Sequence, residues 1–225
     1  MEKKKKLIIF GNSAFAEIAH EYFEMDSSYE VVGFTVESSH LKANQSRGLP
    51  VVPFENLEQH YDPSSHDIFV AVVYTQLNRL RARLAGMAKD KGYSLASYVS
   101  SRAFVWRNVQ MGEHCFVFED NTIQPFVKIG NNVVLWSGNH IGHHSTIQDD
   151  CFISSHVVIS GFCNIGKSSF LGVNCTLADS VALGKDNWIG PSVTITRDSE
   201  PGALFSSSVT EPSRVSALRF FKIKS

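Results

Sequence analysis

Three histidines stand close together in the middle of the chain, in the stretch NHIGHHST that contains His140, His143 and His144. An imidazole with a pKa of about 6.5 can accept a proton near neutral pH, which suits it to general-base catalysis. Imidazole also binds metal ions, but no second group of ligand residues accompanies these three in the sequence. The cluster therefore favours proton transfer over metal binding.

A second candidate for chemistry is the turn GNSAFAE, residues 11–17, which follows an apolar segment and precedes a helical pattern. Free backbone N–H groups at the start of a helix favour phosphate binding. The turn lacks the second and third glycines of the dinucleotide motif GxGxxG. It therefore predicts a mononucleotide or nucleotide-sugar phosphate site, with an ordinary strand-to-helix turn as the alternative.

The first hundred residues alternate strand and helix patterns. The predicted strands are KLIIFG, YEVVGFTVE, LPVVPF, HDIFVAVVY and SLASYVS, at residues 6–11, 29–37, 49–54, 66–74 and 94–100. The predicted helices are AEIAHEYFEM, ENLEQHY and QLNRLRARLAGMAKDKGY, at residues 16–25, 55–61 and 76–93. Such alternation predicts a small parallel sheet with flanking helices, a Rossmann-like α/β half.

From Val105 the sequence repeats every six residues, through sixteen hexads that end at Glu200 without insertion or deletion. Position one is Val, Met, Ile or Leu, position five is Val, Cys, Asn or Ser, and position two is glycine in seven hexads. A fixed short period predicts a solenoid, here a β-helix in which three hexads close a coil of eighteen residues. Glycine at position two suggests a corner with positive φ.

All four cysteines occupy position five, namely Cys115, Cys151, Cys163 and Cys175. That position is small because it packs inside a corner. We therefore expect buried packing residues, with no disulfide and no zinc site.

Composition sets limits on the class of protein. With 43% hydrophobic and 19% charged residues and a net charge of −1, the chain has an ordinary globular composition and no broad basic field for nucleic acid. No apolar run approaches the roughly 20 residues of a membrane span, and the segment at Leu7 lacks the features of a signal peptide. We expect a cytoplasmic protein.

The sequence suggests three parts: an α/β domain at residues 1–100, a β-helix at 101–200 and a C-terminal segment at 201–225. Pro201 and Gly202 are expected to end the solenoid. Leu218, Phe220 and Phe221 could cover its open end or dock on a neighbouring subunit, and the sequence does not choose between these.

The hexads resemble those of the hexapeptide-repeat acyltransferases. Joined to a Rossmann-like half, from IIFGNSAFAE to SVTIT, they look like the sugar acyltransferases of the sialic-acid O-acetyltransferase type. The N-acetyltransferases of the nucleotide-linked 4-amino sugars bacillosamine and perosamine are of this type. The resemblance implies a left-handed parallel β-helix, a homotrimer with active sites between neighbouring helices, and acetyl-CoA as acetyl donor.

The resemblance also assigns catalytic positions. GHHSTIQ aligns with the segment that carries the family's catalytic base, which places His143 at the base and Gly161 at a glycine whose backbone N–H meets the thioester. Since they are eighteen residues apart, His143 and Gly161 should stack in adjacent coils. His144 stands where relatives carry an acid, so Asp149 or Asp150 is expected to orient His143. His144 as the base, or neither histidine, are the alternatives.

The family's ligand positions carry over in the same way. The nucleotide-sugar site maps to the first turn and the end of the second strand, at Asn12, Ser13, Ala14, Phe15 and Thr35. Arg79 is either a further phosphate ligand or an exposed helix charge. The pantetheine chain of acetyl-CoA is expected to run along Gly161, Gly172, Ala178 and Gly190.

These features together predict an acetyl-CoA-dependent N-acetyltransferase. Its substrate would be the 4-amino group of a nucleotide-linked amino-dideoxy sugar used in surface-glycan or lipopolysaccharide synthesis, attacked directly without a covalent acyl-enzyme. An O-acetyltransferase acting on a sugar or sialic acid is one alternative, and a catalytically inactive β-helix that serves as a binding scaffold is another. The sequence leaves the nucleotide and the sugar open.

Overall fold

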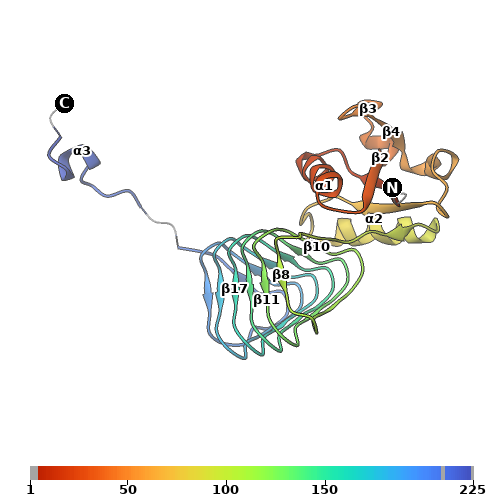
Figure 1. The fold of residues 1–225 in the computed structure, drawn as a ribbon. Coiled ribbons are helices and arrows are strands. Elements are labelled where there is room, and N and C mark those ends of the chain that lie inside the picture. The colour runs from red at the N-terminus through yellow and green to blue at the C-terminus, as the bar shows by residue number, and fades with distance from the viewer. Residues whose placement is uncertain (1–4, 209–210, 224–225) are drawn as a thin grey trace.

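The computed structural model describes residues 5–208 and 211–223, which form an α/β half and a β-helix followed by an extended C-terminal segment (Figure 1). The sheet of the α/β half has the strand order β3-β4-β2-β1-β5-β6 and is parallel except for the β3–β4 pair. Its strands are β1 (Lys5–Phe10), β2 (Tyr29–Val36), β3 (Gln45–Ser46), β4 (Leu49–Pro53), β5 (His66–Val70) and β6 (Ser94–Leu95). The predicted Rossmann-like arrangement is confirmed.

Helices cover both faces of this sheet because its central strand is apolar on both sides. The helices are α1 (Ala14–Met25), α2 (Arg79–Asp90) and two short 3₁₀ helices, η1 (Ser38–His40) and η2 (Phe54–Gln59). On β1, Leu7 and Ile9 pack in the cluster that contains α1, and Ile8 and Phe10 pack in the cluster that contains α2.

The helix expected at 55–61 is the 3₁₀ helix η2, which begins one residue earlier, at Phe54.

One predicted strand, 94–100, belongs to both halves of the molecule. Its first part is β6, which pairs with β5, and its second part is β7 (Tyr98–Val99), which pairs with β10 of the β-helix. The chain therefore passes from one sheet to the next within two residues, without a flexible linker.

The β-helix has three faces of two-residue parallel strands, and strands one coil apart pair residue i with residue i+18. The first face contains β7, β10 (Phe116–Val117), β13 (Val134–Leu135), β16 (Phe152–Ile153), β19 (Phe170–Leu171), β22 (Trp188–Ile189) and β24 (Leu204–Phe205). The second face contains β8 (Phe104–Val105), β11 (Thr122–Ile123), β14 (His140–Ile141), β17 (Val158–Ile159), β20 (Thr176–Leu177) and β23 (Thr194–Ile195). The third face contains β9 (Gln110–Met111), β12 (Lys128–Ile129), β15 (Thr146–Ile147), β18 (Asn164–Ile165) and β21 (Ala182–Leu183).

The interior of the β-helix is built as the hexads predict. Position-one aliphatic residues and position-five small residues form one continuous buried cluster. All four cysteines belong to this cluster and are free and buried, which confirms their packing role. Burial raises the pKa of Cys115 to about 11 and those of Cys151 and Cys175 to about 12, so these thiols are poor nucleophiles near neutral pH.

The reason expected for the position-two glycines is wrong. Positive φ falls on position four, in every hexad from residue 111 to residue 194, and the glycines at position two have ordinary φ. A Cβ at Gly142 or Gly166 would lie 2.5 Å from backbone atoms of the next coil. Glycine is therefore required there because the coils stack so closely, and it is not required for a left-handed backbone conformation.

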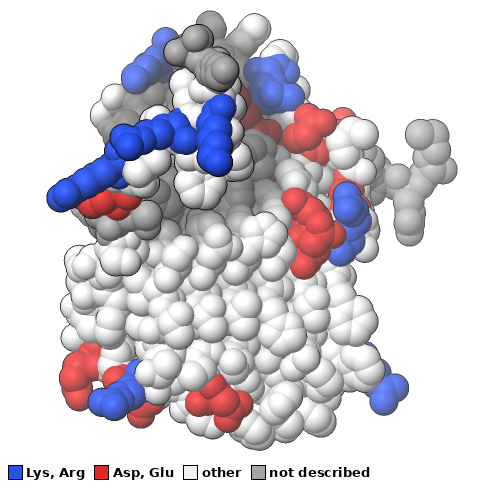
Figure 2. Space-filling view, turned by 90° about the vertical axis from the view of Figure 1, so that its left-hand side faces the viewer, with Lys and Arg blue, Asp and Glu red and all other residues white. Residues whose placement is uncertain are grey.

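The outward side of the first face is apolar and is covered by the α/β half. Phe116 packs against Phe15 and Phe23 at ring distances of 5.6 and 5.8 Å, and Tyr74 lies 4.6 Å from Phe170. Because Phe15, Phe23, Phe116 and Phe170 belong to one apolar cluster, the two halves share a hydrophobic core. Charged side chains are sparse across the middle of the β-helix surface in Figure 2 and gather on the α/β half and at the far corners.

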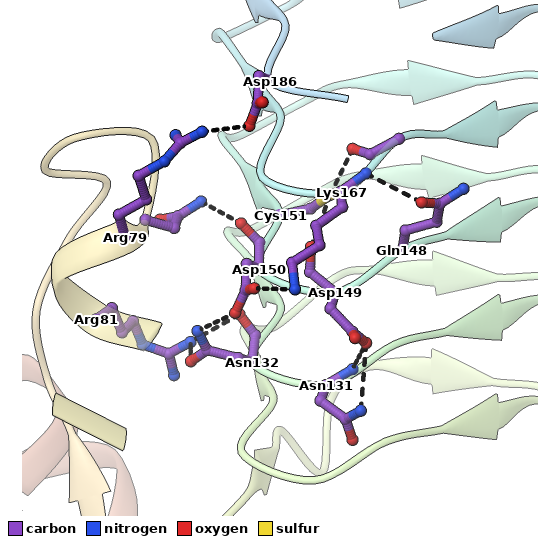
Figure 3. Close-up of polar contacts among 12 residues, drawn as sticks. Arg79, Arg81, Asn131, Asn132, Gln148, Asp149, Asp150, Cys151, Lys167 and Asp186 are labelled. Atoms are coloured by element: carbon purple, nitrogen blue, oxygen red, sulfur yellow. Dashed lines mark hydrogen bonds and ion pairs between the residues drawn. The ribbon is translucent and has the colours of Figure 1, made fainter. Parts of the chain in front are cut away.

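A buried arginine adds polar contacts between the halves. Arg81 of α2 has no solvent exposure and donates to the carbonyl oxygens of Val70 (3.1 Å) and His114 (3.1 Å). It also donates to the carbonyl oxygen of Asn132 at 2.8 Å (Figure 3). Burial, the largest cause, lowers the pKa of Arg81 to about 10, so it remains charged at neutral pH. Its guanidinium therefore links α2, β5 and two corners of the β-helix.

The end of the solenoid differs from the sequence-based expectation. Beyond Pro201 and Gly202, β24 still pairs with β22, although the spacing falls to sixteen residues, as in Trp188 with Leu204. Farther on, α3 (Ala217–Phe220) lies away from the coils in Figure 1 and does not cover the open end. The side chains that could cover that end or dock on a neighbouring subunit, Leu218, Phe220 and Phe221, are 53–72% exposed.

Among the helices in the described parts of the chain, none is long and apolar enough to cross a lipid bilayer.

Candidate active site

His143 lies at the corner between the second and third faces, after β14 and before β15. Its ring packs over Gly161 of the next coil. A Cβ placed on Gly161 would lie 2.7 Å from Cε1 and 3.1 Å from Nε2 of His143. The expected stacking of these two residues is therefore confirmed, and Gly161 must lack a side chain for the ring to lie there.

The backbone N–H of Gly161 has no hydrogen-bond acceptor among the described residues. At two other turns of the chain a glutamine nineteen residues earlier caps the corresponding N–H. Gln124 caps His143, one coil before Gly161, at 2.9 Å, and Gln148 caps Lys167 at 3.2 Å. At Gly161 the residue nineteen positions earlier is Gly142, which has no side chain to cap it. A Cβ on Gly142 would lie 2.6 Å from the Gly161 nitrogen, so this glycine also keeps the donor clear.

His144 lies beside His143 in a ladder of rings at the same corner. Its ring stacks between Phe126 and Phe162, at centroid distances of 4.6 and 4.9 Å and interplanar angles of 27° and 19°. Nδ1 of His144 is 3.2 Å from Nδ1 of His143. The ring of His144 therefore contacts the ring of His143, the base expected from the sequence.

The aspartates expected to orient His143 contact other groups, so that expectation is wrong. Asp149 accepts hydrogen bonds from the backbone and side chain of Asn131, and Asp150 pairs with Lys167 at 3.3 Å (Figure 3). Both lie at the next corner, between the third and first faces, because six residues advance the chain by one corner. The acidic residue near Gly161 is Asp179, whose Oδ1 would lie 3.1 Å from a Cβ on that glycine.

A pocket of about 340 Å³ opens at the carboxyl edge of the N-terminal sheet. Gly11, Asn12 and Ser13 line it together with Glu37 and Arg83. Gly11 has φ of 137°, and a Cβ there would lie 2.8 Å from the carbonyl oxygen of Ala71, so only glycine fits this turn. The first turn thus presents exposed Asn12 and Ser13 side chains to a cavity, as a phosphate-binding turn would.

Other positions assigned to the nucleotide lie elsewhere. Thr35 is fully buried and donates from Oγ1 to the carbonyl of Val52 at 2.9 Å, and Phe15 packs in the core between the two halves. Ala14 is exposed at the start of α1 but does not line the pocket. Neither Thr35 nor Phe15 offers a side chain to a ligand, because both side chains are buried.

Of the two expectations for Arg79, a phosphate ligand or an exposed helix charge, the structure favours the second, since its side chain is 53% exposed. It pairs with Asp186 of the β-helix at 2.7 Å and is absent from the pocket lining (Figure 3). The arginine at the pocket is Arg83, one turn later on α2, which binds both oxygens of Glu37 at 2.9 and 3.0 Å. That hydrogen bonding lowers the pKa of Glu37. Arg83 follows Arg79 by four residues, so the two side chains are neighbours on the helix surface. This spacing indicates Arg83 as a second candidate cation in the sequence.

The positions assigned to acetyl-CoA fall on two corners. Gly161 and Ala178 lie on the His143 corner, in adjacent coils. Gly172 and Gly190 lie eighteen residues apart on the corner between the first and second faces, and both are buried. A Cβ on Gly172 would lie 2.8 Å from the carbonyl carbon of Gly190, so this pair serves the close stacking of coils.

The three histidines of the opening cluster do not converge. His140 belongs to β14 on the second face, whereas His143 and His144 occupy the corner. No group of three or more His, Cys, Asp or Glu side chains among the described residues is arranged to hold a metal ion.

The fold defines a class of protein: a left-handed β-helix of hexapeptide repeats that follows an α/β half. The profile of the bacterial transferase hexapeptide family (six repeats) matches residues 126–161, which include His143, His144 and Gly161. No curated protein matches the chain by sequence.

Solved structures share the whole architecture. The acetyltransferase domain of PglB from Neisseria gonorrhoeae has a TM-score of 0.81 and 22% identity, over 93% of this chain and 100% of that one. PerB from Caulobacter crescentus, solved with CoA and GDP-perosamine, has a TM-score of 0.80 and 24% identity, over 90% of this chain and 94% of that one. At these identities the likeness establishes the fold, and function has to be argued from the site.

Proposed function

We propose that this protein transfers an acetyl group from acetyl-CoA to the amino group of a nucleotide-linked amino-dideoxy sugar. The observation that carries the proposal is the stack of the His143 ring on Gly161, whose N–H meets no acceptor in the described parts of the chain. A proton acceptor and an oxyanion donor side by side are what acyl transfer to an amine requires. The similar structures supply the substrate class, since one of them holds CoA and a nucleotide-linked amino sugar.

In this proposal Nε2 of His143 takes the proton that the attacking amine must lose, and later passes it to the departing thiolate. The Gly161 N–H donates to the carbonyl oxygen as negative charge develops there. Such a donor is typically worth about 2.7–4 kcal/mol in the transition state. Acetyl-CoA supplies the activated acyl group. Transfer is direct, because the four thiols are buried and their pKa values are raised.

The pocket at Gly11, Asn12 and Ser13 is the proposed nucleotide-sugar site. It lies at the carboxyl edge of a parallel sheet, beside the start of α1, where free N–H groups favour a phosphate. Arg83 is the nearby cation, and it would have to exchange Glu37 for a phosphate oxygen.

The active unit is proposed to be a homotrimer. Phe126 and Phe162 are 54% and 55% exposed at the His143 corner, so a neighbouring β-helix would cover them and close the site. Ala178 and the two stacked glycines, Gly172 and Gly190, remain candidate contacts for the pantetheine chain. The product would be a 4-acetamido sugar for surface-glycan synthesis, made in the cytoplasm, where nucleotide sugars and acetyl-CoA are available.

The decisive test is His143→Ala. Purified wild-type protein is incubated with acetyl-CoA and a panel of UDP-, dTDP- and GDP-linked amino sugars, and acetylated product is measured by mass spectrometry. Wild type should acetylate one of these, and the variant should lose at least 10²-fold of the rate, because a general base typically contributes 10²–10⁴-fold. Light scattering and circular dichroism should show a folded trimer for both proteins.

A variant that keeps full activity would exclude His143 as the base. The hydroxyl form of the best nucleotide sugar serves as the control acceptor. Acetylation of that form in preference to the amine would replace the proposal with O-acetylation, and absence of acetyl-CoA binding by calorimetry would favour a binding scaffold.

A further inference from the structure

We propose that His144 is the positioning residue of the general base and replaces the carboxylate of the more usual His–acid pair. Neutral His144 accepts the Nδ1–H of His143 at its own Nδ1, which leaves Nε2 of His143 free to take the substrate proton. The inference rests on the proposed function for its role in catalysis, but the hydrogen bond itself is a property of the protein alone.

The geometry holds His144 in one orientation. Its backbone is left-handed, with φ of 58°, like the residues one coil below and above, Phe126 (65°) and Phe162 (56°). The stacking of all three rings fixes the plane of the imidazole. The Nδ1 atoms of the two histidines are 3.2 Å apart, with the rings nearly perpendicular at 85°.

A hydrogen bond between two Nδ1 atoms admits one proton, so the two rings must adopt opposite tautomers. If His144 donated, His143 would carry its own proton on Nε2. It could then not accept a proton from a substrate amine bound beside Gly161. If His143 donates, its Nε2 lone pair faces the space beside Gly161. Nε2 would lie 3.1 Å from a Cβ placed on that glycine. The second arrangement is the one compatible with catalysis.

Asp179 approaches Gly161 from the next coil and accepts from Ser180 Oγ at 2.8 Å, and Phe126 and Phe162 are uncharged. No lysine or arginine of the described residues forms an ion pair with Asp179. An imidazole acceptor differs from a carboxylate in one respect: it can itself be protonated, and the pair then loses the acceptor.

Three substitutions of His144 separate these roles. His144→Phe keeps a stacking ring and removes the acceptor, and its backbone fits because Phe occupies the equivalent left-handed positions above and below. His144→Asn offers a neutral acceptor that does not titrate, and asparagine tolerates a left-handed conformation. His144→Asp restores a carboxylate.

We expect His144→Phe to lower kcat about 10²-fold with KM for the sugar unchanged, and His144→Asn to retain kcat within about tenfold of wild type. His144→Asp should also remain active, and the acid limb of its kcat/KM profile should move about one unit toward higher pH, because a carboxylate stabilises the protonated base. A His144→Phe variant with wild-type kcat, or a His144→Asn variant as inactive as the Phe variant, would overturn the proposal.

Nitrogen-15 NMR of the histidine side chains tests the hydrogen bond without any substrate. Near pH 8 His143 should carry its proton on Nδ1 and His144 on Nε2, and His144→Phe should abolish the preference at His143. The reverse tautomers in wild type would contradict the inference even if acetyl transfer is observed. Conversely, the predicted tautomers in a protein that acetylates no acceptor would uphold the pair and refute the proposed function.

Discussion

Gly142 and Gly161 are adjacent glycines in stacked coils, and the protein uses their missing side chains differently. At Gly142 a Cβ would meet backbone atoms of the next coil at 2.5–2.7 Å, which cannot move without opening the stack. At Gly161 the nearest atoms belong to the side chains of His143 and Asp179. The first glycine is therefore required for stability as well as for a clear N–H at Gly161, and the second is required for the placement of a catalytic ring.

Gly161→Ala should lower acetyl transfer about 10²-fold and leave the unfolding midpoint almost unchanged, because an exposed ring can move aside and a small misplacement is costly for catalysis. The matched control is Gly142→Ala, which should lower the free energy of unfolding by about 1–3 kcal/mol. Urea denaturation and initial rates measure both. Wild-type activity in Gly161→Ala would remove the His143–Gly161 stack from the mechanism.

At the scale of elements, a second period lies over the six-residue repeat. On the first face the outward residues are Phe116, Val134, Phe152, Phe170 and Trp188, all apolar and eighteen residues apart. On the second and third faces the same hexad position is mostly polar, as in Thr122 and Lys128. This pattern marks the face that the α/β half covers, and the six-residue analysis alone does not reveal it.

The same substitution, phenylalanine to alanine, at one buried and one exposed outward position tests whether the first face holds the two halves together. Phe170 is 6% exposed at the boundary of the two halves, whereas Phe104 is 53% exposed at the equivalent outward position of the second face. Phe170→Ala should lower the free energy of unfolding by about 3 kcal/mol or more, and Phe104→Ala by about 0.5 kcal/mol. Equal losses in urea denaturation would mean that the first face does not hold the halves together.

For the whole molecule, acid sensitivity is expected at the contact that His114 makes between the two halves. It is fully buried, accepts from the Val70 N–H at Nε2 (2.9 Å) and contacts Asn132 Oδ1 through Nδ1 (2.8 Å). Burial, together with the charge of Arg81, lowers the pKa of His114 well below its ordinary value. The contact between the halves therefore depends on a neutral imidazole.

Because the folded state holds this imidazole neutral, the unfolded state binds the extra proton below a pH of about 6.5. The free energy of unfolding should therefore be constant from pH 8 to 7 and fall as the pH drops below about 6.5, by up to about 1.4 kcal/mol per pH unit. Urea denaturation across this range measures the slope.

His114→Gln should flatten that slope. His60→Gln, at an exposed position of the α/β half, is the matched control. An unchanged slope in His114→Gln would assign the acid sensitivity to other groups.

The sequence by itself determined the parallel strands of the α/β half, but not β3, and it determined the coil of eighteen residues and the stacking of His143 on Gly161. These features depend on local periodicity, because a residue's position in the repeat determines its position in the strand or coil. The buried cysteines follow from the same rule, because a residue's place in the hexad decides whether it points inward.

Only the tertiary structure decided which groups meet across corners and between halves. Asp149 and Asp150 are near His143 in sequence, yet six residues turn the chain through one corner and direct them toward Asn131 and Lys167. Arg79 lies beside the expected pocket in sequence, but the docked β-helix supplies Asp186 as its partner. Such contacts depend on how distant segments pack together, and this information is absent from the six-residue pattern.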